Sequence, residues 1–253
     1  MNYGLYLSAT GVMASSYRQD VIANNLANSE TNGFKRDLAV FHERQTEAKE
    51  RGAGSSSNPL LENLTGGMFA SPTLVDHSQG DLESTGHASD AAIEGSGYFM
   101  VDDHGTQRLT RNGQFLTDAS GNLIVGDGSG QRVLDSDRKP INFDSRHPID
   151  IGKDGTISQQ GKAVARIGVF DVPDPNKLSK HGGTLMDYPE MDQAKISANS
   201  VIHSGSLEHS NVDPAVELTQ LMSAQRELEA NANMIRYQDQ TLSRLVNDVA
   251  KIS

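Results

Sequence analysis

The chain has 253 residues, of which 36% are hydrophobic and 5% aromatic, with no Trp; this allows one large or two modest domains whose core is small or distributed. Its 33 acidic and 22 basic residues give a net charge of -11, and no run of Lys or Arg could track a phosphate backbone, which argues against nucleic acid as a partner. The absence of Cys excludes disulfides, thiol catalysis and Cys-ligated metals.

No stretch reaches the apolar length that a membrane-spanning helix needs, so we expect no membrane insertion. The first twenty residues lack the basic start and the unbroken apolar core of a signal peptide.

Residues 3–28 are predicted to form a helix, because apolar residues recur there near the helical period. Small residues dominate its apolar face and would let another backbone approach closely. Gly4 and Gly11 each lower the helix propensity by about 1 kcal/mol relative to Ala. The helix is therefore expected to be marginal on its own.

This helix ends in a segment rich in asparagine, VIANNLANSETNGFKR at residues 21–36. Asn favours helix ends and turns over helix interiors, because its amide both donates and accepts hydrogen bonds. We expect Asn32-Gly33 to reverse the chain and Phe34 to anchor the exit. A simple helix end explains Asn28, but it does not explain the pair Asn24-Asn25 inside the helix.

The middle of the chain predicts antiparallel β structure. Residues 41–85 read as an extended connector with a Gly/Ser/Asn-rich part at 52–67, and residues 86–205 as a β-rich domain. Turn residues separate short apolar runs, and no helix-length pattern intervenes. The runs are 98–101, 107–110, 114–117, 122–125, 132–134, 149–151, 155–158 and 165–170, with a looser stretch at 184–207; the turns are Asp103-His104-Gly105, Asn112-Gly113, Ser120-Gly121-Asn122, Asp127-Gly128 and Asp154-Gly155.

The last part of the chain, 206–253, predicts a long helix at about 214–250. Asp213 suits a helix N-cap and Pro214 the first helical position. A seven-residue repeat runs along it and predicts a helix–helix seam. One stripe is apolar, and the other is polar at Asn231 and Gln238, which can fix register or partner number. The first stripe is Leu221, Leu228, Ile235, Leu242 and Val249, and the second is Ala224, Asn231, Gln238, Leu245 and Ile252.

The sequence holds few candidates for a phosphate-binding, acid–base or metal site. The glycine pairs at 95–97 and 126–130 lack the strand–turn–helix context of a phosphate loop, so they are read as turns. Asp102-Asp103-His104 is the one cluster that could support acid–base or metal chemistry, but the adjacent Gly105 favours a hairpin tip. His203 and His209 have no carboxylates arranged around them in the sequence, and the sequon at Asn63 is attributed to chance. The sequence predicts no catalytic residue, no cofactor and no metal.

Five short motifs carry a resemblance that spans nearly the whole chain. They are DVIANNLAN with TNGFK (residues 20–35), AIEGSGYF (92–99), LTRNG (109–113), GSLEHSNV (205–212) and the Gln225-Arg226 element with Leu228-Glu229. With these motifs the chain resembles the flagellar basal-body rod and hook proteins, whose members share axial terminal helices around a variable β domain. It departs from the family pattern at Ala91, Leu109, Ser204 and Leu228.

The resemblance implies a mixed α and β fold, in which N- and C-terminal axial helices form a coiled-coil-like pair around a mainly antiparallel β central domain. The corresponding division of the chain is 1–40, 41–85, 86–205 and 206–253. The compact middle and the stretch 166–178 are more similar to rod proteins than to the longer hook protein, and they favour the proximal over the distal rod.

The implied function is that of a non-enzymatic rod subunit, which polymerises through its terminal helices into the drive shaft that carries motor torque across the periplasm. Export through the flagellar type III apparatus, without a cleaved signal peptide, is implied as well. The implied partners are this chain's own copies and other rod subunits, with ring and hook proteins as further candidates.

The expected assembly residues lie on the two terminal helices and on the turn after the first one. Leucine and isoleucine side chains are expected to bury against neighbours, Asn24, Asn25 and Asn28 to contact the helix end and adjacent subunits, and Asn231 and Gln238 to set register. The full set is Leu5, Ala9, Val12, Ile22, Asn24, Asn25, Leu26, Asn28, Gly33, Phe34, Leu221, Leu228, Asn231, Ile235, Gln238, Leu242, Leu245 and Val249.

Two other classes stay open on the sequence. One is a secreted glycan-binding or hydrolytic β module that uses Asp102, Asp103 and His104 and is oligomerised by its helices. The other is a trimeric coiled-coil adhesin, which would form a closed oligomer in place of a growing polymer.

Overall fold

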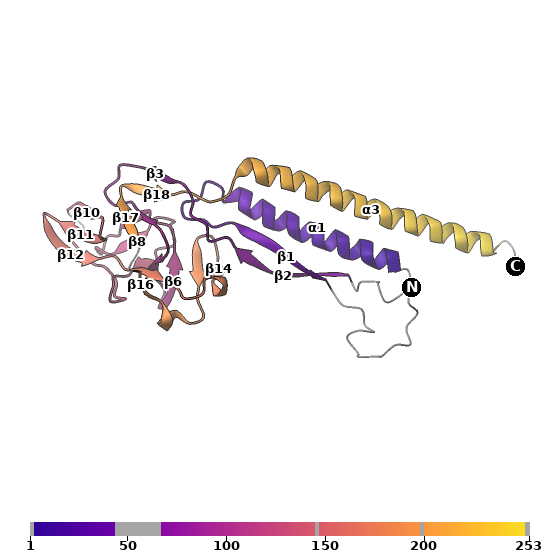
Figure 1. Ribbon diagram of the computed structural model, residues 1–253. Coiled ribbons are helices and arrows are strands. Elements are labelled where there is room, and N and C mark those ends of the chain that lie inside the picture. Colours follow the sequence, from indigo (N-terminus) through magenta and orange to yellow (C-terminus); the bar gives the residue numbers. More distant parts are fainter. Residues whose placement is uncertain (1–2, 44–66, 145–146, 198–199, 251–253) are drawn as a thin grey trace. The chain divides into compact units, whose positions relative to one another are not determined.

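The computed structural model describes residues 3–43, 67–144, 147–197 and 200–250, which belong to two compact units (Figure 1). Unit 1 takes residues from 1–26, 37–74 and 214–253, and unit 2 from 27–36 and 75–213. Both terminal segments of the sequence therefore belong to unit 1. The division at residues 40, 85 and 205 stays a prediction, and the two units do not follow it.

Unit 1 holds the helices α1 (Tyr3–Ala27) and α3 (Pro214–Ala250) and a two-stranded sheet of β1 (Asp37–Glu43) and β2 (Met68–Val75). The predictions of a helix over 3–28 and of another over about 214–250 are confirmed to within a residue. Neither helix is long and apolar enough to cross a membrane.

β2 corrects the interpretation of 41–85 as an extended connector. Pro72 lies inside this strand and weakens the strand signal of its sequence, MFASPTLV. A two-stranded sheet has only edges, where Pro is tolerated. The structure also places β3 in the same range; residues 44–66, which include the sequon at Asn63, lie outside the described part.

Unit 2 confirms the prediction of an antiparallel β region, since every strand pairing recorded in it is antiparallel. Its largest sheet has the strand order β14-β15-β6-β5-β9-β8-β7, with β13 pairing both β5 and β16, and smaller sheets are β10-β11-β12, β17-β4 and β18-β3. The elements are β3 (Leu82–Ser84), β4 (Ala91–Glu94), β5 (Tyr98–Asp103), β6 (Thr106–Thr110), β7 (Phe115–Thr117), β8 (Leu123–Val125), β9 (Arg132–Val133), β10 (Ile149–Ile151), β11 (Thr156–Gln159), β12 (Lys162–Arg166), β13 (Val169–Asp171), β14 (Ser179–His181), β15 (Leu185–Asp187), β16 (Lys195–Ile196), β17 (Val201–Ser204) and β18 (Ser206–Glu208), with short 3-10 turns at Pro175–Lys177 and Met191–Gln193.

β5 lies at the centre of the core. Side chains alternate between the two faces of a strand, and those of β5 enter two separate hydrophobic clusters: Phe99 and Val101 enter one, Tyr98 and Met100 the other. The continuous apolar run at 98–101 is therefore that of a strand buried on both faces. A core split in this way fits the low aromatic content.

The predicted turn at Asp103-His104-Gly105 is confirmed as the tip of the β5–β6 hairpin. Asp103 pairs with Thr106 across it, and the two residues between them, His104 and Gly105, have φ values of 52° and 96°. Such a pair of left-handed residues matches the twist of the flanking strands.

Two expectations within the β region are wrong. Asn112-Gly113 is not a hairpin turn, because the strands on either side of it, β6 and β7, are not neighbours in the sheet; glycine is needed there because a Cβ on Gly113 would lie 1.6 Å from the Ala91 carbonyl oxygen. The run 165–170 is not one strand. It breaks at Gly168, where a Cβ would lie 2.7 Å from the Asp135 carbonyl oxygen, and its halves join different sheets as β12 and β13.

Candidate assembly site

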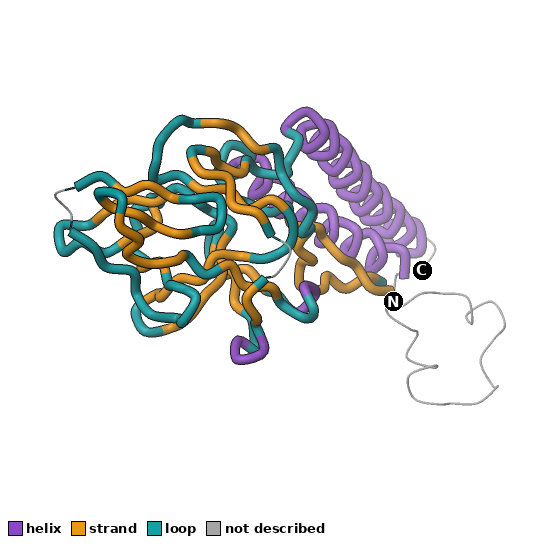
Figure 2. Tube along the Cα trace, turned by 60° about the vertical axis from the view of Figure 1, so that its left-hand side comes forward, coloured by secondary structure: helices purple, strands orange, loops and turns teal. Residues whose placement is uncertain are grey.

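The helices α1 and α3 of unit 1 lie side by side and run in opposite directions (Figures 1 and 2). A Cβ on Gly4 would lie 2.6 Å from Gln238 Nε2, and one on Gly11 would lie 2.8 Å from Asn231 Nδ2. Closer to the end of α1, Arg18 Nη1 contacts Glu227 Oε2 at 3.1 Å. The α3 partner number falls as the α1 number rises, so the helices are antiparallel.

The two polar residues of the predicted seam therefore lie opposite the two glycines of α1. Gly4 and Gly11 are seven residues apart, as are Asn231 and Gln238, and seven residues make about two helical turns. The glycines leave room for the amide side chains of Asn231 and Gln238, which would have to shift if either glycine carried a Cβ. Sequence inspection found the glycines and the amides separately but not their pairing.

The predicted seam residues divide into two groups along α3. Leu221, Leu228, Ile235 and Leu242 are half-buried together with Asn231 and Gln238, and Ala224 is buried. Leu245, by contrast, is 59% exposed. The side chain of Val249 and the whole of Ile252 lie outside the described residues.

The difference follows from the unequal lengths of the helices. α1 begins at Tyr3, and Gly4 already lies opposite Gln238, so the part of α3 after Asp239 extends past the first described residue of α1. We call α3 residues 240–250 the overhang; Leu242 at its beginning is still half-buried, and Leu245 to Asn247 are exposed. At 1.5 Å per residue the overhang is about 16 Å long.

On α1 the predicted residues are placed as follows. Leu5, Ala9, Val12 and Leu26 are half-buried, Ile22 is buried, Asn24 is exposed and Asn25 is buried.

Asn25 holds the first residue of β1. Its Nδ2 donates to the Asp37 carbonyl at 2.8 Å, and its Oδ1 accepts from the Asp37 amide at 2.9 Å. The amide side chain thus pairs with Asp37 as a neighbouring strand would. The side-chain amide of Asn25 is thus engaged with Asp37 and not with the end of α1, which explains an Asn inside the helix. A contact of Asn25 with adjacent subunits stays a prediction.

The same side of α1 packs on the β1–β2 sheet. Tyr17 meets the ring of Phe41 edge-on, with 6.0 Å between ring centroids, and its hydroxyl donates to the Ser71 carbonyl at 3.1 Å. The Arg18 guanidinium lies 5.3 Å from the centre of the Phe41 ring. α1 is therefore covered by α3 and by this sheet.

The turn after α1 belongs to unit 2 and confirms the predicted chain reversal. The Asn28 carbonyl accepts from the Thr31 amide at 3.1 Å. Across Asn32-Gly33 the Thr31 carbonyl accepts from the Phe34 amide at 3.2 Å, and Gly33 has a φ of 70°. The Gly33 amide donates to the Glu208 carbonyl at 2.7 Å. Phe34 is buried, as predicted, with the Lys180 ammonium 3.6 Å from the centre of its ring.

Three fully buried charges meet beside this turn: Lys35, Arg111 and Glu208, which we call the buried triad. Lys35 Nζ lies 2.5 Å from Glu208 Oε1, and Arg111 Nη1 lies 3.1 Å from Glu208 Oε2. Side-chain exposure is 0% for Lys35 and Glu208 and 4% for Arg111. One carboxylate thus bridges two cations in the interior of unit 2.

Backbone groups complete the hydrogen bonding of the triad. Lys35 Nζ donates to the Ser78 carbonyl at 2.7 Å, and Glu208 Oε1 accepts from the Gly80 amide at 3.0 Å. Arg111 Nη2 donates to the Gly95 carbonyl at 2.7 Å. Burial lowers the pKa of the Lys35 ammonium, the Glu208 carboxylate opposes that shift, and the Arg111 guanidinium adds to it.

Asn211 ties the same chain segments together next to the triad. Its Oδ1 accepts from the Arg36 amide at 2.7 Å. Its Nδ2 donates to the carbonyls of Asp76 and Ser78 at 3.0 and 3.1 Å. Sequence inspection noted Lys35, Arg111, Glu208 and Asn211 only as letters of motifs. The signal that could have singled out Lys35 is its position directly beside the buried aromatic Phe34.

The alternative site at Asp102, Asp103 and His104 is a hairpin tip with its carboxylates paired. Asp102 Oδ1 accepts from the Gly105 amide at 2.8 Å, and its Oδ2 lies 2.5 Å from Arg132 Nη2. Asp103 pairs with Arg108. His203 lies 2.6 Å from Glu94 Oε2 and His209 contacts Glu83, pairings that the sequence did not reveal. The described residues contain no group of three or more candidate ligands that could hold a metal.

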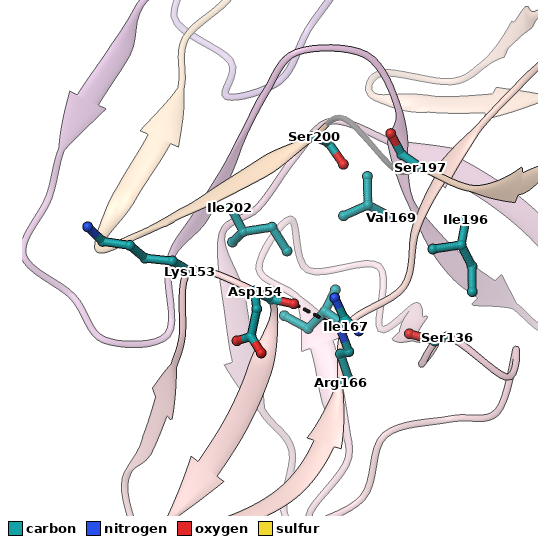
Figure 3. Close-up of a pocket in the computed structure, with 10 residues that line it drawn as sticks. All are labelled: Ser136, Lys153, Asp154, Arg166, Ile167, Val169, Ile196, Ser197, Ser200 and Ile202. Carbon is teal, nitrogen blue, oxygen red and sulfur yellow. Dashed lines mark hydrogen bonds between the residues drawn. The ribbon is translucent and has the colours of Figure 1, made fainter.

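A small pocket of about 60 Å³ opens in unit 2 between the start of β17, the β10–β11 turn and the end of β12 (Figure 3). Lys153, Asp154 and Arg166 contribute its charged groups. Arg166 Nε donates to the Asp154 carbonyl at 2.9 Å, and the Asp154 carboxylate is held by Thr156, whose hydrogen bonds lower its pKa. The charged groups of the Asp154 and Arg166 side chains hold the β10–β11 turn, so this pocket is no stronger a candidate for a chemical site than the Asp102-Asp103-His104 hairpin tip.

Among the described residues, unit 1 pairs the two terminal helices, with an overhang of α3 beyond Tyr3, and unit 2 is an antiparallel β unit. Three family models match the chain: "Flagella basal body rod protein" over residues 5–35, "Flagellar hook protein FlgE/F/G D1 domain" over 92–159 and "Flagellar basal body rod FlgEFG protein C-terminal" over 203–248.

Whole-length relatives agree with these models. The flagellar basal-body rod protein FlgF of Caulobacter vibrioides is 35% identical over 237 residues, 93% of either chain. The flagellar basal-body rod protein FlgG of Bacillus subtilis is 32% identical over 258 residues, 96% of this chain and 97% of that one. The chain belongs to the flagellar basal-body rod protein family, and it is a structural rod subunit of the flagellar basal body.

Proposed function

We propose that the chain polymerises through its terminal helices into an open helical array that transmits motor torque. The observation that carries the proposal is the overhang of α3. Its side chains Leu245 and Val246 are 59% and 63% exposed. Leu245 continues the stripe of Ala224, Asn231 and Gln238, which is buried or half-buried, and Val246 is the next residue along the helix. A second chain that covered the overhang would continue the same seam.

Other apolar side chains of unit 1 are exposed as well. Met13 on α1 is 70% exposed, and Met222 and Tyr237 on α3 are 54% and 65% exposed. Soluble monomers rarely leave large apolar patches uncovered. These side chains are the surfaces that neighbouring subunits would bury, at about 1.5–3 kcal/mol for each Leu- or Met-sized residue.

The contact between an overhang and another subunit is heterologous, because the overhang meets a surface different from itself. Such contacts generate open helical arrays where the rotation does not close. In this arrangement the α1–α3 pair acts as a coiled-coil-like element, and Asn231 and Gln238 set its register through the glycines opposite them.

Within the rod we place the subunit in the proximal part, on the basis of its compact β unit and the stretch 166–178. The alternative is a distal-rod subunit. We further propose export through the flagellar type III apparatus without a cleaved signal peptide, a position across the periplasm, and contacts with paralogous rod subunits and with ring and hook proteins.

The test replaces Leu245 and Val246 by Asp in the full-length chain. The matched control replaces Ser243 and Asn247, exposed polar residues of the same turns, by Asp. Purified basal bodies are then assayed for the subunit by immunoblotting. The double variant of the overhang is expected to be exported but missing from basal bodies, while the control is incorporated.

Incorporation of the overhang variant at the wild-type level would show that the terminal-helix mechanism is wrong. Circular dichroism tests whether the terminal helices become more helical on assembly. We expect higher helicity in the assembled rod than in the free monomer, and equal helicity in both would contradict this.

A further inference from the structure

The segment that completes the buried triad comes from the far end of unit 2. Lys35 lies near its start and Arg111 in its middle, and both side chains are buried. Glu208, the carboxylate between them, is six residues from the start of α3. Until residue 208 has joined the unit, burying Lys35 and Arg111 leaves two cations together without their anion, which is strongly unfavourable.

The strand pairings repeat this order. β17 pairs with β4 through four residue pairs, and β18 pairs with β3 through three. β3 and β4 precede the large sheet in the sequence, whereas β17 and β18 follow it. The early strands therefore gain their partners only when the last ones arrive.

Backbone bonds add to the same closure. The Gly33 amide donates to the Glu208 carbonyl, and the Gly205 amide donates to the Asp90 carbonyl at 2.8 Å. Asn211 joins Arg36, Asp76 and Ser78. Residues 201–211, which we call the closing segment, thus contact the beginning of unit 2 through ladder hydrogen bonds, a buried ion pair and a side-chain amide.

We propose that the closing segment is a folding checkpoint, so that unit 2 becomes a protected, cooperatively folded body only when Glu208 bridges Lys35 and Arg111. The large sheet alone does not form a stable core under this proposal. If the chain emerges from a channel with its N-terminus first, unit 2 stays unfolded until residue 208, about four-fifths of the way along the chain, has emerged. Its use during export rests on the proposed function, but the folding property itself does not.

The test is hydrogen–deuterium exchange of the purified full-length chain, read by mass spectrometry. Glu208→Gln removes the negative charge at nearly constant shape. Exchange in β5 and β6, which belong to the large sheet, is expected to rise by roughly a hundred-fold or more, in parallel with exchange in β3, β4 and the closing segment. Glu208→Asp, which keeps the charge but shortens its reach, gives the same readout if the Gln variant does not fold.

Faster exchange confined to β3, β4 and the closing segment, with β5 and β6 protected as in the wild type, would overturn the proposal, and so would unchanged exchange throughout. Glu83→Gln is the matched control, because it removes the exposed pair between Glu83 on β3 and His209 directly after β18, and it is expected to leave the large sheet unchanged. Lys35→Met combined with Glu208→Gln is expected to regain protection relative to Glu208→Gln; equal exchange in these two variants counts against the charge bridge. Failure of the overhang variant in basal bodies is a separate result, because the exchange experiment involves neither export nor assembly.

Discussion

The turn at Gly33 offers a direct test of how closely the segments of unit 2 are packed. Gly33 has a φ of 70°, and a Cβ there would lie 2.3 Å from the Asn112 amide nitrogen and 2.4 Å from the Arg111 carbonyl carbon. Both are backbone atoms, so the clash cannot be relieved by rotating a side chain. Gly86 has a φ of 72°, but no atom lies within 4 Å of the same added Cβ.

The two glycines therefore separate backbone strain from crowding. In Gly86→Ala the left-handed conformation alone is expected to cost about 1–2 kcal/mol of the free energy of unfolding. In Gly33→Ala the same strain adds to about 1–3 kcal/mol of overpacking. Loss of the bond from the Gly33 amide to the Glu208 carbonyl adds about 0.5–1.5 kcal/mol. The expected total for Gly33→Ala is about 2.5–6.5 kcal/mol.

Urea denaturation of both full-length variants, followed by intrinsic tyrosine fluorescence, measures this difference. Equal destabilisation of Gly33→Ala and Gly86→Ala, within about 0.5 kcal/mol, would refute the close approach of the turn to residues 111–112, because that approach is the main difference between the two sites.

Three further predictions concern the helices and the pH dependence. Gly11→Ala is expected to destabilise the wild-type helix pair by crowding Asn231. In an Asn231→Ala background only the helix propensity counts, and the same substitution is expected to stabilise the pair by up to about 1 kcal/mol. Thermal melts of the four chains, followed by circular dichroism, show whether the effect of Gly11→Ala changes sign. Asn25→Ala is expected to cost about 1–3 kcal/mol and to make the Asp37 amide exchange faster, as read by hydrogen–deuterium exchange. Burial lowers the pKa of His77 from its usual 6.5, so the unfolded chain binds the proton more readily and stability is lost as the pH falls below about 6.5; urea titrations between pH 5 and 8 should show a flatter profile in His77→Gln.

The sequence predicted those parts of the fold that depend on local patterns. The α3 helix has an apolar repeat and an Asp-Pro start, and its bounds agree with the structure. The β5–β6 hairpin follows from a two-residue turn that tolerates positive φ. Both features can be recognised within a window of a few residues.

Features that depend on contacts between distant segments were missed or misread. Gly113 looks like a turn glycine, but it is there because the Ala91 backbone passes close to it. Asn25 looks like a helix-end residue, but it pairs with a strand twelve residues away. The buried triad unites positions 35, 111 and 208, and nothing within any one motif specifies the other two.

The close grouping of those three positions leaves the rest of the β unit free to vary in size. The chain departs from the triad after Asn112 and returns at Glu208, and the hairpin between β11 and β12 ends in Gln160-Gly161, where an added Cβ on Gly161 meets no atom within 4 Å. Because doubling the length of a flexible loop costs only about 0.6 kcal/mol in closure entropy, a foreign domain grafted at this tip would leave the triad intact. The protein can thus serve as a carrier that displays an added domain without altering the residues that close its own fold.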